Sequence, residues 1–403
     1  MTTETGLAPT PTNEVVPVVT RKFGDPWDIV IDEETLADRR RTLIESARKK
    51  LWDPREDGPN NKGVFTFGPE LAQYGALSLG EALGFAKAIG SDVAQPSGNH
   101  IDLIQASADS EYRGGVLRAF DEADIPLLSV SIHCDTYAAL AVRDDEKAKM
   151  FTPSRIQGFP ADDTSNQHLQ RLALMIQGAA ELGIPALHLF WGAPKNLPAY
   201  KWPPITAEQI AAMREEFVRL VKPLQELAAK LGIKLCHEIH FGTIAMNADD
   251  FITIWEMLGK PDNFGAGFDP SHFWHGETWW QALDKLRKAG VKVFLAHAKN
   301  TSLFAGRAIL GYQADDRLLG MSFASLDSPH GIVDFVQYGG MLTLSGIVEF
   351  WFGMGLPVPL YAEAENPFFR IEDVSRKAIE HLRHTLGGYR LPKGHFTDAM
   401  AKR

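Results

Sequence analysis

Acidic and histidine side chains stand at the ends of four short apolar segments in the second half of the chain. The segments close with Cys-His-Glu-Ile-His at 236–240, Phe-Asp-Pro-Ser-His at 268–272, Ala-His-Ala-Lys at 296–299 and Ala-Glu-Ala-Glu at 362–365. Short apolar or β-branched runs of this kind are typical of buried strands. We therefore expect each polar group to lie at the carboxyl end of its own strand.

Side-chain alternation then indicates which of these residues share a face. Glu238 and His240 are two positions apart, as are His297 and Lys299, so each pair points to one side of its strand. We expect one acidic or histidine residue from each strand end to meet the others at a common rim. The candidates are Glu238, Asp269, His297 and one of the two glutamates Glu363 and Glu365, which also share a face.

Three carboxylates and one imidazole form an oxygen-rich ligand set for a divalent cation. The set suits Mn²⁺ best, with Mg²⁺, Co²⁺ and Zn²⁺ as alternatives, and an octahedral ion keeps positions open for substrate oxygens. A single strand-end Asp or His more often anchors a loop than binds a metal. Four of them at the same end of successive strands favour an active site with one divalent ion.

Other polar residues fall near the same rim. His133 closes the apolar segment 127–133 and is either a catalytic base or substrate contact, or a structural hydrogen-bonding residue. We expect His240 to support the metal shell or the substrate. Lys299 either stabilises negative charge on the substrate or only neutralises the acidic rim. Alternation does not place His188, because leucines flank it on both sides.

Tryptophans also cluster after the predicted strands. Tryptophan offers a flat apolar face to a ring-shaped ligand, although it more often fills core space. We expect Trp191 and Trp274 to contact substrate. Trp279 and Trp280 follow Thr278 at the start of a predicted helix, where packing is the better interpretation.

Strand-like and helix-like segments alternate from Gly63 onward. We expect strands at 64–68, 92–96, 127–133, 186–191, 234–240, 264–269, 293–299 and 360–365. Two intervening helices carry the reciprocal capping pattern, at Ser78 with Glu81 and at Thr206 with Gln209. Eight strands, each followed by a helix, predict a (β/α)8 TIM barrel, whose active sites form at the strand carboxyl ends. The competing fold is an open doubly wound sheet, but no glycine-rich phosphate loop follows the first strand.

The remaining segments extend a single domain. We expect a flexible N-terminal tail at 1–25, a helical lead-in at 26–62, the barrel at 63–390 and a C-terminal tail at 391–403. A long glycine-containing insertion at 302–342 follows the seventh strand, and loops of this length are usually lids or interface elements.

The composition is that of a soluble globular protein. The chain of 403 residues is 45% hydrophobic and 23% charged, and it has no apolar run long enough to cross a membrane. No signal peptide is evident, so we expect a cytoplasmic location. The two cysteines, Cys134 and Cys236, are interpreted as buried small residues. The formal net charge of −10 disfavours nucleic acid as a partner.

The second half of the chain resembles the xylose isomerase-like TIM barrel superfamily of sugar phosphate isomerases and epimerases. The residues that carry the resemblance are Glu-Ile-His, Gly-Phe-Asp-Pro-Ser-His and His-Ala-Lys-Asn within 234–301, and Ala-Glu-Ala-Glu-Asn-Pro at 362–367. The resemblance implies that the metal ligands are Glu238, Asp269, His297 and Glu363. The family's Asp-x-x-His pattern implies a substrate contact at His272. Asn300 and Asn366 stand where family members often have Asp, so the surroundings of the metal differ.

The resemblance also implies a reaction. In the epimerases, two glutamates flank the substrate and exchange protons on opposite faces, and these positions are Glu238 and Glu363 here. We expect a divalent-metal-dependent isomerase or epimerase that acts on a keto-sugar through a metal-stabilised enediolate. The expected partners are a small sugar or glycoside and further copies of the chain in a homo-oligomer.

Two other functions share parts of this chemistry. A lyase that cleaves a 3-keto-glycoside begins with the same proton abstraction, with His133 as the acid near the leaving group; similar C-glycoside-cleaving barrels pair with a small accessory subunit. A DNA-repair endonuclease needs a basic groove and more histidines for several zinc ions, which the acidic balance disfavours. A binding barrel without activity does not account for four intact ligand positions.

Overall fold

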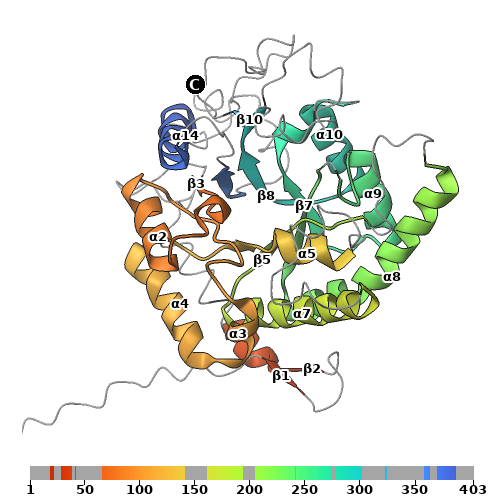
Figure 1. Ribbon diagram of the computed structural model, residues 1–403, viewed down its shortest axis with the longest axis horizontal. Helices are drawn as coiled ribbons and strands as arrows, with labels where there is room; N and C mark the ends of the chain where they lie inside the picture. The colour runs from red at the N-terminus through yellow and green to blue at the C-terminus, as the bar shows by residue number, and fades with distance from the viewer. Residues whose placement is uncertain are drawn as a thin grey trace, which may run out of the picture.

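The computed structural model shows a ring of strands enclosed by helices (Figure 1). It describes residues 19–21, 29–38, 41, 66–140, 161–193, 205–240, 242–273, 277–301, 323–324, 358–363 and 370–386.

Seven parallel strands form the central sheet, in the order β3-β11-β8-β7-β6-β5-β4. Their bounds are β3 Phe67–Pro69, β4 Ser129–Ser131, β5 Ala186–Leu189, β6 Lys234–Glu238, β7 Phe264–Phe268, β8 Val293–Ala298 and β11 Leu360–Ala362. From β4 to β11, consecutive strands of this sheet are neighbours in it, and β3 pairs with β11, as the predicted barrel requires.

The segment 92–98 closes the ring between the two edge strands β3 and β4. Isolated parallel bridges join Gln95 to Glu70 and Ser97 to Ser131, and the Ser131 N–H donates to the Pro96 carbonyl at 2.9 Å. The strand predicted at 92–96 is therefore not a regular strand, because Pro96 has no N–H to donate to a ladder. The eighth position of the barrel is nevertheless filled.

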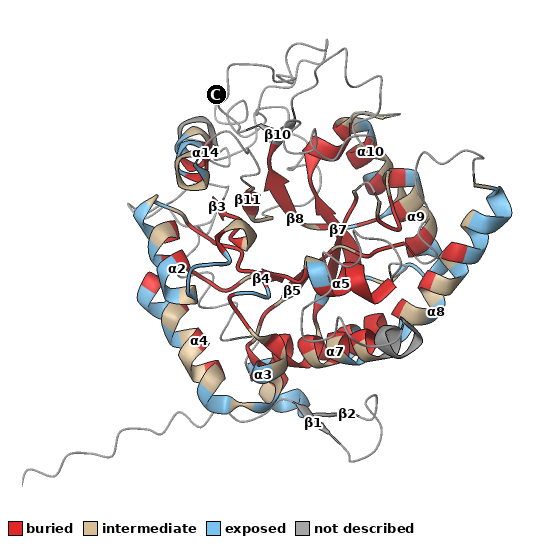
Figure 2. Ribbon diagram, in the orientation of Figure 1, coloured by how far each residue is buried: buried red, intermediate tan, exposed pale blue. Residues whose placement is uncertain are grey.

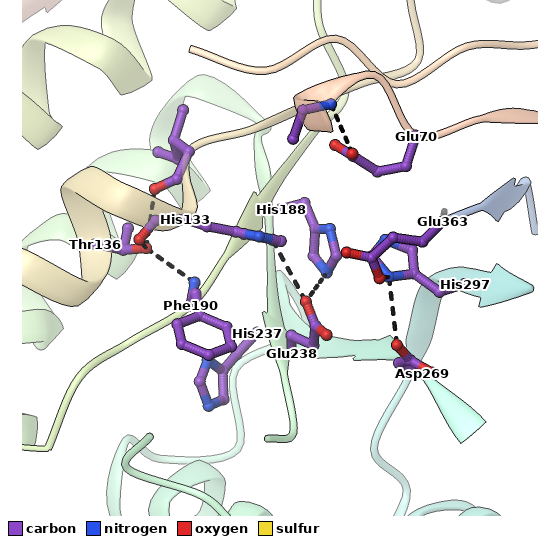
Figure 3. Close-up of polar contacts among 12 residues, drawn as sticks. Glu70, His133, Thr136, His188, Phe190, His237, Glu238, Asp269, His297 and Glu363 are labelled. Carbon is purple, nitrogen blue, oxygen red and sulfur yellow. Dashed lines mark hydrogen bonds and ion pairs between the residues drawn. The ribbon is translucent and has the colours of Figure 1, made fainter. Parts of the chain in front are cut away.

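Helices cover the outside of the ring and turn their buried faces toward it (Figure 2). They are α2 Leu79–Ala88, α3 Leu103–Ala108, α4 Ser110–Ala123, α7 Ala161–Glu181, α8 Ala207–Leu231, α9 Ala248–Met257, α10 Trp279–Ala289 and α14 Ile371–Leu386. The short helix α5 (His133–Leu140) starts just after β4 and lies toward the middle of the view in Figure 1, and 3-10 turns occur at η1 (Ala72–Tyr74) and η3 (Pro270–His272). The capping boxes of Ser78 with Glu81 and of Thr206 with Gln209 are both present. Apolar residues between helices and sheet form one large core cluster.

Two short antiparallel pairs lie outside the barrel sheet. β1 (Val19–Arg21) pairs with β2 (Ile29–Ile31), and residues 33–38 are helical. Only these parts of the predicted tail and lead-in are described, and β1 is an ordered element that the tail prediction did not include. β9 (Asn300–Thr301) pairs with β10 (Phe323–Ala324) inside the predicted insertion. The rest of 302–342 and all of 391–403 lie outside the described residues.

The third strand ends earlier than its apolar sequence suggests. β4 stops at Ser131, and His133 is the first residue of α5, so the strand predicted over 127–133 is too long at both ends. Cys134 consequently lies in the first turn of a helix and is exposed, which corrects the prediction that both cysteines are buried; Cys236 is buried. No helix in the described part of the chain has the length and apolar character needed to cross a bilayer.

Candidate metal centre

Four neighbouring strands deliver the four expected ligand residues to one point. Glu238 is the last residue of β6, Asp269 and Glu363 directly follow β7 and β11, and His297 lies near the end of β8. One ligand atom from each of these residues lies within 4.8 Å of the others (Figure 3). The carboxyl ends of parallel strands meet at one rim of a barrel, which brings these side chains together.

The distances inside this group match those between ligands of one cation. His297 Nδ1 is 2.9 Å from Glu363 Oε2 and 3.7 Å from Asp269 Oδ2. Two adjacent ligand atoms, each about 2.1 Å from an octahedral ion, lie about 3.0 Å apart. Asp269 is fully buried and His297 is almost fully buried. The donor set and its spacing fit a divalent cation.

Two cationic or hydrogen-bonding groups border the carboxylates. The Lys299 ammonium donates to Glu363 Oε2 at 2.8 Å and lies 3.2 Å from Asp269 Oδ2. His272 Nε2 lies 3.1 Å from both Glu238 Oε1 and Asp269 Oδ2. The structure thus places Lys299 and His272 beside these carboxylates, and their predicted contacts with substrate stay predictions.

The charged side chains of this group shift one another's pKa values. Burial raises the pKa of Glu363, but Lys299 and His297 outweigh it and bring that pKa to about 2. Burial likewise opposes ionisation of Glu238 and Asp269, yet the imidazoles, with Lys299 for Asp269, hold the pKa of each carboxyl well below its usual value. Burial lowers the pKa of His297, and the surrounding carboxylates reverse this, so its pKa lies well above normal. The carboxylates are therefore ionised at neutral pH, as metal ligands must be.

A pair of histidines faces the other side of Glu238. His133 Nε2 and His188 Nε2 lie 3.5 and 3.6 Å from Glu238 Oε2, and the two imidazole rings meet edge to face at 4.4 Å (Figure 3). Burial is the main cause of a lowered pKa at both histidines. Both rings are thus held neutral and offer a nitrogen lone pair.

His188, which the strand alternation alone does not place, lies in β5 and is fully buried. In a barrel the outward strand residues are covered by helices, so a polar residue between two leucines marks the inward face. The pattern Leu187-His188-Leu189 carries that signal. The ring also needs space, which β7 supplies, since a Cβ added to Gly267 would lie 2.4 Å from His188 Nε2.

Two more buried polar residues near the site were also missed. Glu70 follows β3 and lies beside Glu363 in Figure 3; its Oε2 accepts a hydrogen bond from the Ala72 N–H at 2.6 Å. Burial and the nearby Glu363 carboxylate raise the pKa of Glu70 well above normal. Gln95 lies in the segment that closes the ring and is fully buried. Neither residue stands at the end of a clear apolar run, so periodicity did not single them out.

Aromatic side chains are distributed differently from the prediction. Trp191 is buried against Phe217 of α8, with ring centroids 6.0 Å apart, so the structure does not bring its ring to the metal centre. Phe190, one residue earlier, contacts the rings of His133 and His240 instead. This one-residue difference follows from alternation. His240 also contacts the ring of His272, at 3.9 Å between centroids.

Trp274 lies outside the described residues, so its predicted substrate contact stays a prediction. Trp279 is buried, and Trp280 is partly buried and packs against the core, as expected for the start of α10.

Comparison with known proteins fits this geometry. Residues 83–383 match the family model described as xylose isomerase-like TIM barrel. The chain belongs to this family. No curated protein matches the chain.

Solved structures of the xylose isomerase-like fold resemble this chain at low sequence identity. A 3-keto-D-glucoside 4-epimerase from E. coli is 12% identical, with a TM-score of 0.54 over 79% of this chain and 99% of that one. A Mycobacterium smegmatis barrel in complex with magnesium is 14% identical, with a TM-score of 0.52 over 81% and 97%. A probable 3-DHS dehydratase from Bacillus anthracis is 14% identical, with a TM-score of 0.50 over 79% and 98%. At these identities the likeness shows the fold alone.

Proposed function

We propose that this protein is a divalent-metal-dependent isomerase or epimerase of a keto-sugar or sugar derivative. The observation that carries the proposal is the group formed by Glu238, Asp269, His297 and Glu363 at the strand ends. These residues would hold the cation, with Mn²⁺ as the preferred ion. When bound, the cation would polarise a substrate carbonyl and stabilise the negative charge that develops on its oxygen.

Glu238 and Glu363 are the proposed proton-transfer residues. They come from β6 and β11, which are separated in the sheet by β7 and β8, so the two carboxylates reach the site from different sides. One removes the proton on the carbon next to the carbonyl, and the other returns a proton to the opposite face or the neighbouring carbon. Both are ionised through the pKa shifts described above, so either can remove the proton. The other glutamate must take up a proton from solvent before it returns one to the substrate.

Lys299 and His272 are proposed to hold charge and substrate in place. Lys299 is almost fully buried and already contacts two carboxylates, so its ammonium group remains near any negative charge that develops on substrate. His272 and His240 stack edge to face and offer ring nitrogens to sugar hydroxyl groups. Phe190 supplies the apolar face that we had expected from Trp191.

The second candidate is a lyase that acts on a 3-keto-glycoside. It starts with the same proton removal but then expels a leaving group, which needs a general acid. His133, 3.5 Å from Glu238 Oε2 and partly exposed, is the candidate for this acid. Because its ring is neutral, it would have to take up a proton before it donates one to the leaving group. The likeness to an epimerase of a 3-keto-glucoside supports the isomerase, whereas the likeness to a dehydratase supports elimination. We favour the isomerase, acting in the cytoplasm as a homo-oligomer; an accessory subunit belongs to the lyase alternative.

Incubation with 3-keto-sugars in heavy water, followed by NMR, tests both candidates. Each should exchange the carbon-bound hydrogen next to the carbonyl for deuterium, provided that the abstracted proton reaches solvent. An isomerase then yields an epimer, and Glu238→Gln and Glu363→Gln should each stop its formation. Release of a free aglycone from a 3-keto-glycoside, with no epimer from any keto-sugar and a strong loss in His133→Ala, would establish the lyase instead.

A further inference from the structure

Gln95 lies at the centre of a buried hydrogen-bond chain inside the barrel. Its amide Nε2 donates to Ser129 Oγ at 2.9 Å, and Ser129 Oγ donates to the Tyr361 hydroxyl at 2.9 Å. Gln95 and Tyr361 are fully buried, and Ser129 is almost fully buried. The Ser129 hydroxyl donates its proton to Tyr361, so the Ser129 oxygen is left to accept a hydrogen bond from Gln95. The NH₂ end of the Gln95 amide therefore faces Ser129.

The other end of the amide, the carbonyl oxygen Oε1, faces two histidines. His188 Nδ1 lies 3.3 Å from it and His297 Nε2 lies 3.4 Å from it. A carbonyl oxygen only accepts hydrogen bonds, so both ring nitrogens must carry hydrogen. His188 is held neutral, so its remaining nitrogen, Nε2, has the lone pair. In His297 the remaining nitrogen is Nδ1, which would have a lone pair once a bound cation replaces the proton that the carboxylates favour there.

These two remaining nitrogens face the carboxylates of the site. His297 Nδ1 faces Glu363 Oε2 and Asp269 Oδ2, inside the proposed ligand group. His188 Nε2 faces Glu238 Oε2. If the amide were reversed, its NH₂ group would face both rings, and a neutral His297 would carry its proton on Nδ1. That tautomer has no lone pair directed at the ligand group.

We propose that Gln95 is a positioning residue that sets the tautomers of His297 and His188 together, so that His297 binds the cation through Nδ1 and His188 presents Nε2 to the site. The inference about His297 rests on the proposed function, whereas the inference about His188 is independent of any cation. A single carbonyl oxygen thus couples a metal ligand on β8 to a second histidine on β5. Outer partners of this kind typically change metal affinity by about 10- to 100-fold when they are removed.

The direct test is long-range ¹H–¹⁵N NMR of the imidazole rings in protein saturated with Mg²⁺, which is diamagnetic. In the unmodified protein we expect His188 to be protonated on Nδ1 and His297 on Nε2. Gln95→Leu should release the His188 tautomer and weaken Mg²⁺ binding by about 10- to 100-fold in a chelator competition. Gln95→Glu, whose carboxylate still accepts from both rings, should retain both tautomers.

Two further variants separate positioning from general destabilisation. Ser129→Ala removes the contact that orients the amide and should give a mixed His188 tautomer even if Gln95→Leu does not fold. Gln225→Leu removes another buried glutamine, which bonds to Asn263 away from the site, and should leave both rings and Mg²⁺ affinity unchanged.

The result that would overturn the inference is a His188 protonated on Nε2 in the unmodified protein, or unchanged tautomers and Mg²⁺ affinity in both Gln95→Leu and Ser129→Ala. Failure of the proposed function has a different signature. The unmodified protein would then bind no Mg²⁺ or Mn²⁺, while the His188 tautomer would still decide whether Gln95 acts as proposed.

Discussion

His188 Nε2 occupies the space that a side chain at Gly267 would need, since a Cβ at that position would lie 2.4 Å away. We expect Gly267→Ala to force the imidazole out of its position, at a cost of about 1–3 kcal/mol in the free energy of unfolding. Steady-state kinetics should show a fall in kcat of about 10-fold or more if His188 serves the reaction. Denaturant titration measures the stability change.

The control is Gly84→Ala on the outside of α2, where an added Cβ meets no atom within 4 Å. This substitution should raise stability by about 0.5–1 kcal/mol, because alanine is the better helix former, and leave kcat unchanged. Full activity in Gly267→Ala with a displaced His188 ring would show that the histidine is not needed for turnover.

Removal of single ligands tests the metal centre. Asp269→Ala and His297→Ala should each lower Mn²⁺ affinity by more than about 100-fold and abolish turnover, because a ligand lost from the ion itself matters at least as much as a lost outer partner. Circular dichroism should be unchanged, since both residues stand at the rim. A matched control is Asp262→Ala, which loses only an exposed ion pair with Lys292. Normal metal content and activity in both ligand variants would disprove the assignment.

Removal of the ion itself should act reversibly. Dialysis against a chelator should abolish proton exchange into substrate, and Mn²⁺ should restore it more fully than Mg²⁺ or Zn²⁺, given the oxygen-rich ligand set. Metal analysis of the purified protein, together with activity after each addition, provides the measurement. Undiminished exchange in metal-free protein would contradict the proposed mechanism.

The barrel, and the meeting of Glu238, Asp269, His297 and Glu363 at its rim, could be predicted from the sequence for a physical reason. Outward strand residues are buried under helices, so strands appear as apolar runs, and polar residues at their ends stand out at Glu238, Asp269 and Glu363. Polar residues inside the barrel do not stand at the end of an apolar run, so the sequence pattern does not mark them. His188 lies within an apolar run, and Gln95 precedes a proline that prevents regular strand pairing. Phe190, and not Trp191, points toward the histidines of the site. Which of the two does so depends on the register of β5, and that register is set by pairing with the neighbouring strands and not by the local sequence.

Tyr74 provides a test of how the C-terminal helix docks. Its hydroxyl donates to the Ile371 carbonyl at 3.0 Å and lies 2.7 Å from Ser375 Oγ, which ties η1 to α14. Burial raises the pKa of Tyr74 to about 12. Since the folded pKa lies above the unfolded value, this contribution is complete below pH about 10 and is lost as the pH rises through 12.

Tyr74→Phe should therefore be less stable than the unmodified protein at pH 8 by about 1 kcal/mol. The difference between the two proteins should shrink as the pH rises from 10 to 12, because only the unmodified chain has this phenol to ionise. Thermal unfolding across that range measures it. A difference that stays constant with pH would show that the Tyr74 phenol is not held neutral by the fold.

The insertion after β8 gives a further prediction. Its described part, β10, pairs with β9 directly after Lys299. If 302–342 is a lid or an interface, shortening it outside Phe323–Ala324 should raise KM or change the oligomeric state without unfolding the barrel, since a lid acts by closing over substrate. Kinetics and solution mass provide the readouts. If neither changes, the insertion serves neither purpose.

The seam at 92–98 also affects how the barrel moves. Every other junction of the ring is a ladder between regular strands, but here isolated bridges flank a proline. Local opening starts where backbone pairing is weakest, so amides near this seam should exchange with solvent sooner than those of β6 to β8. Gln95 lies within the seam. A fluctuation that opens the barrel at this point would therefore also release His297 and His188 from their shared acceptor, Gln95 Oε1. Local opening of the barrel would in this way change the tautomers of both histidines.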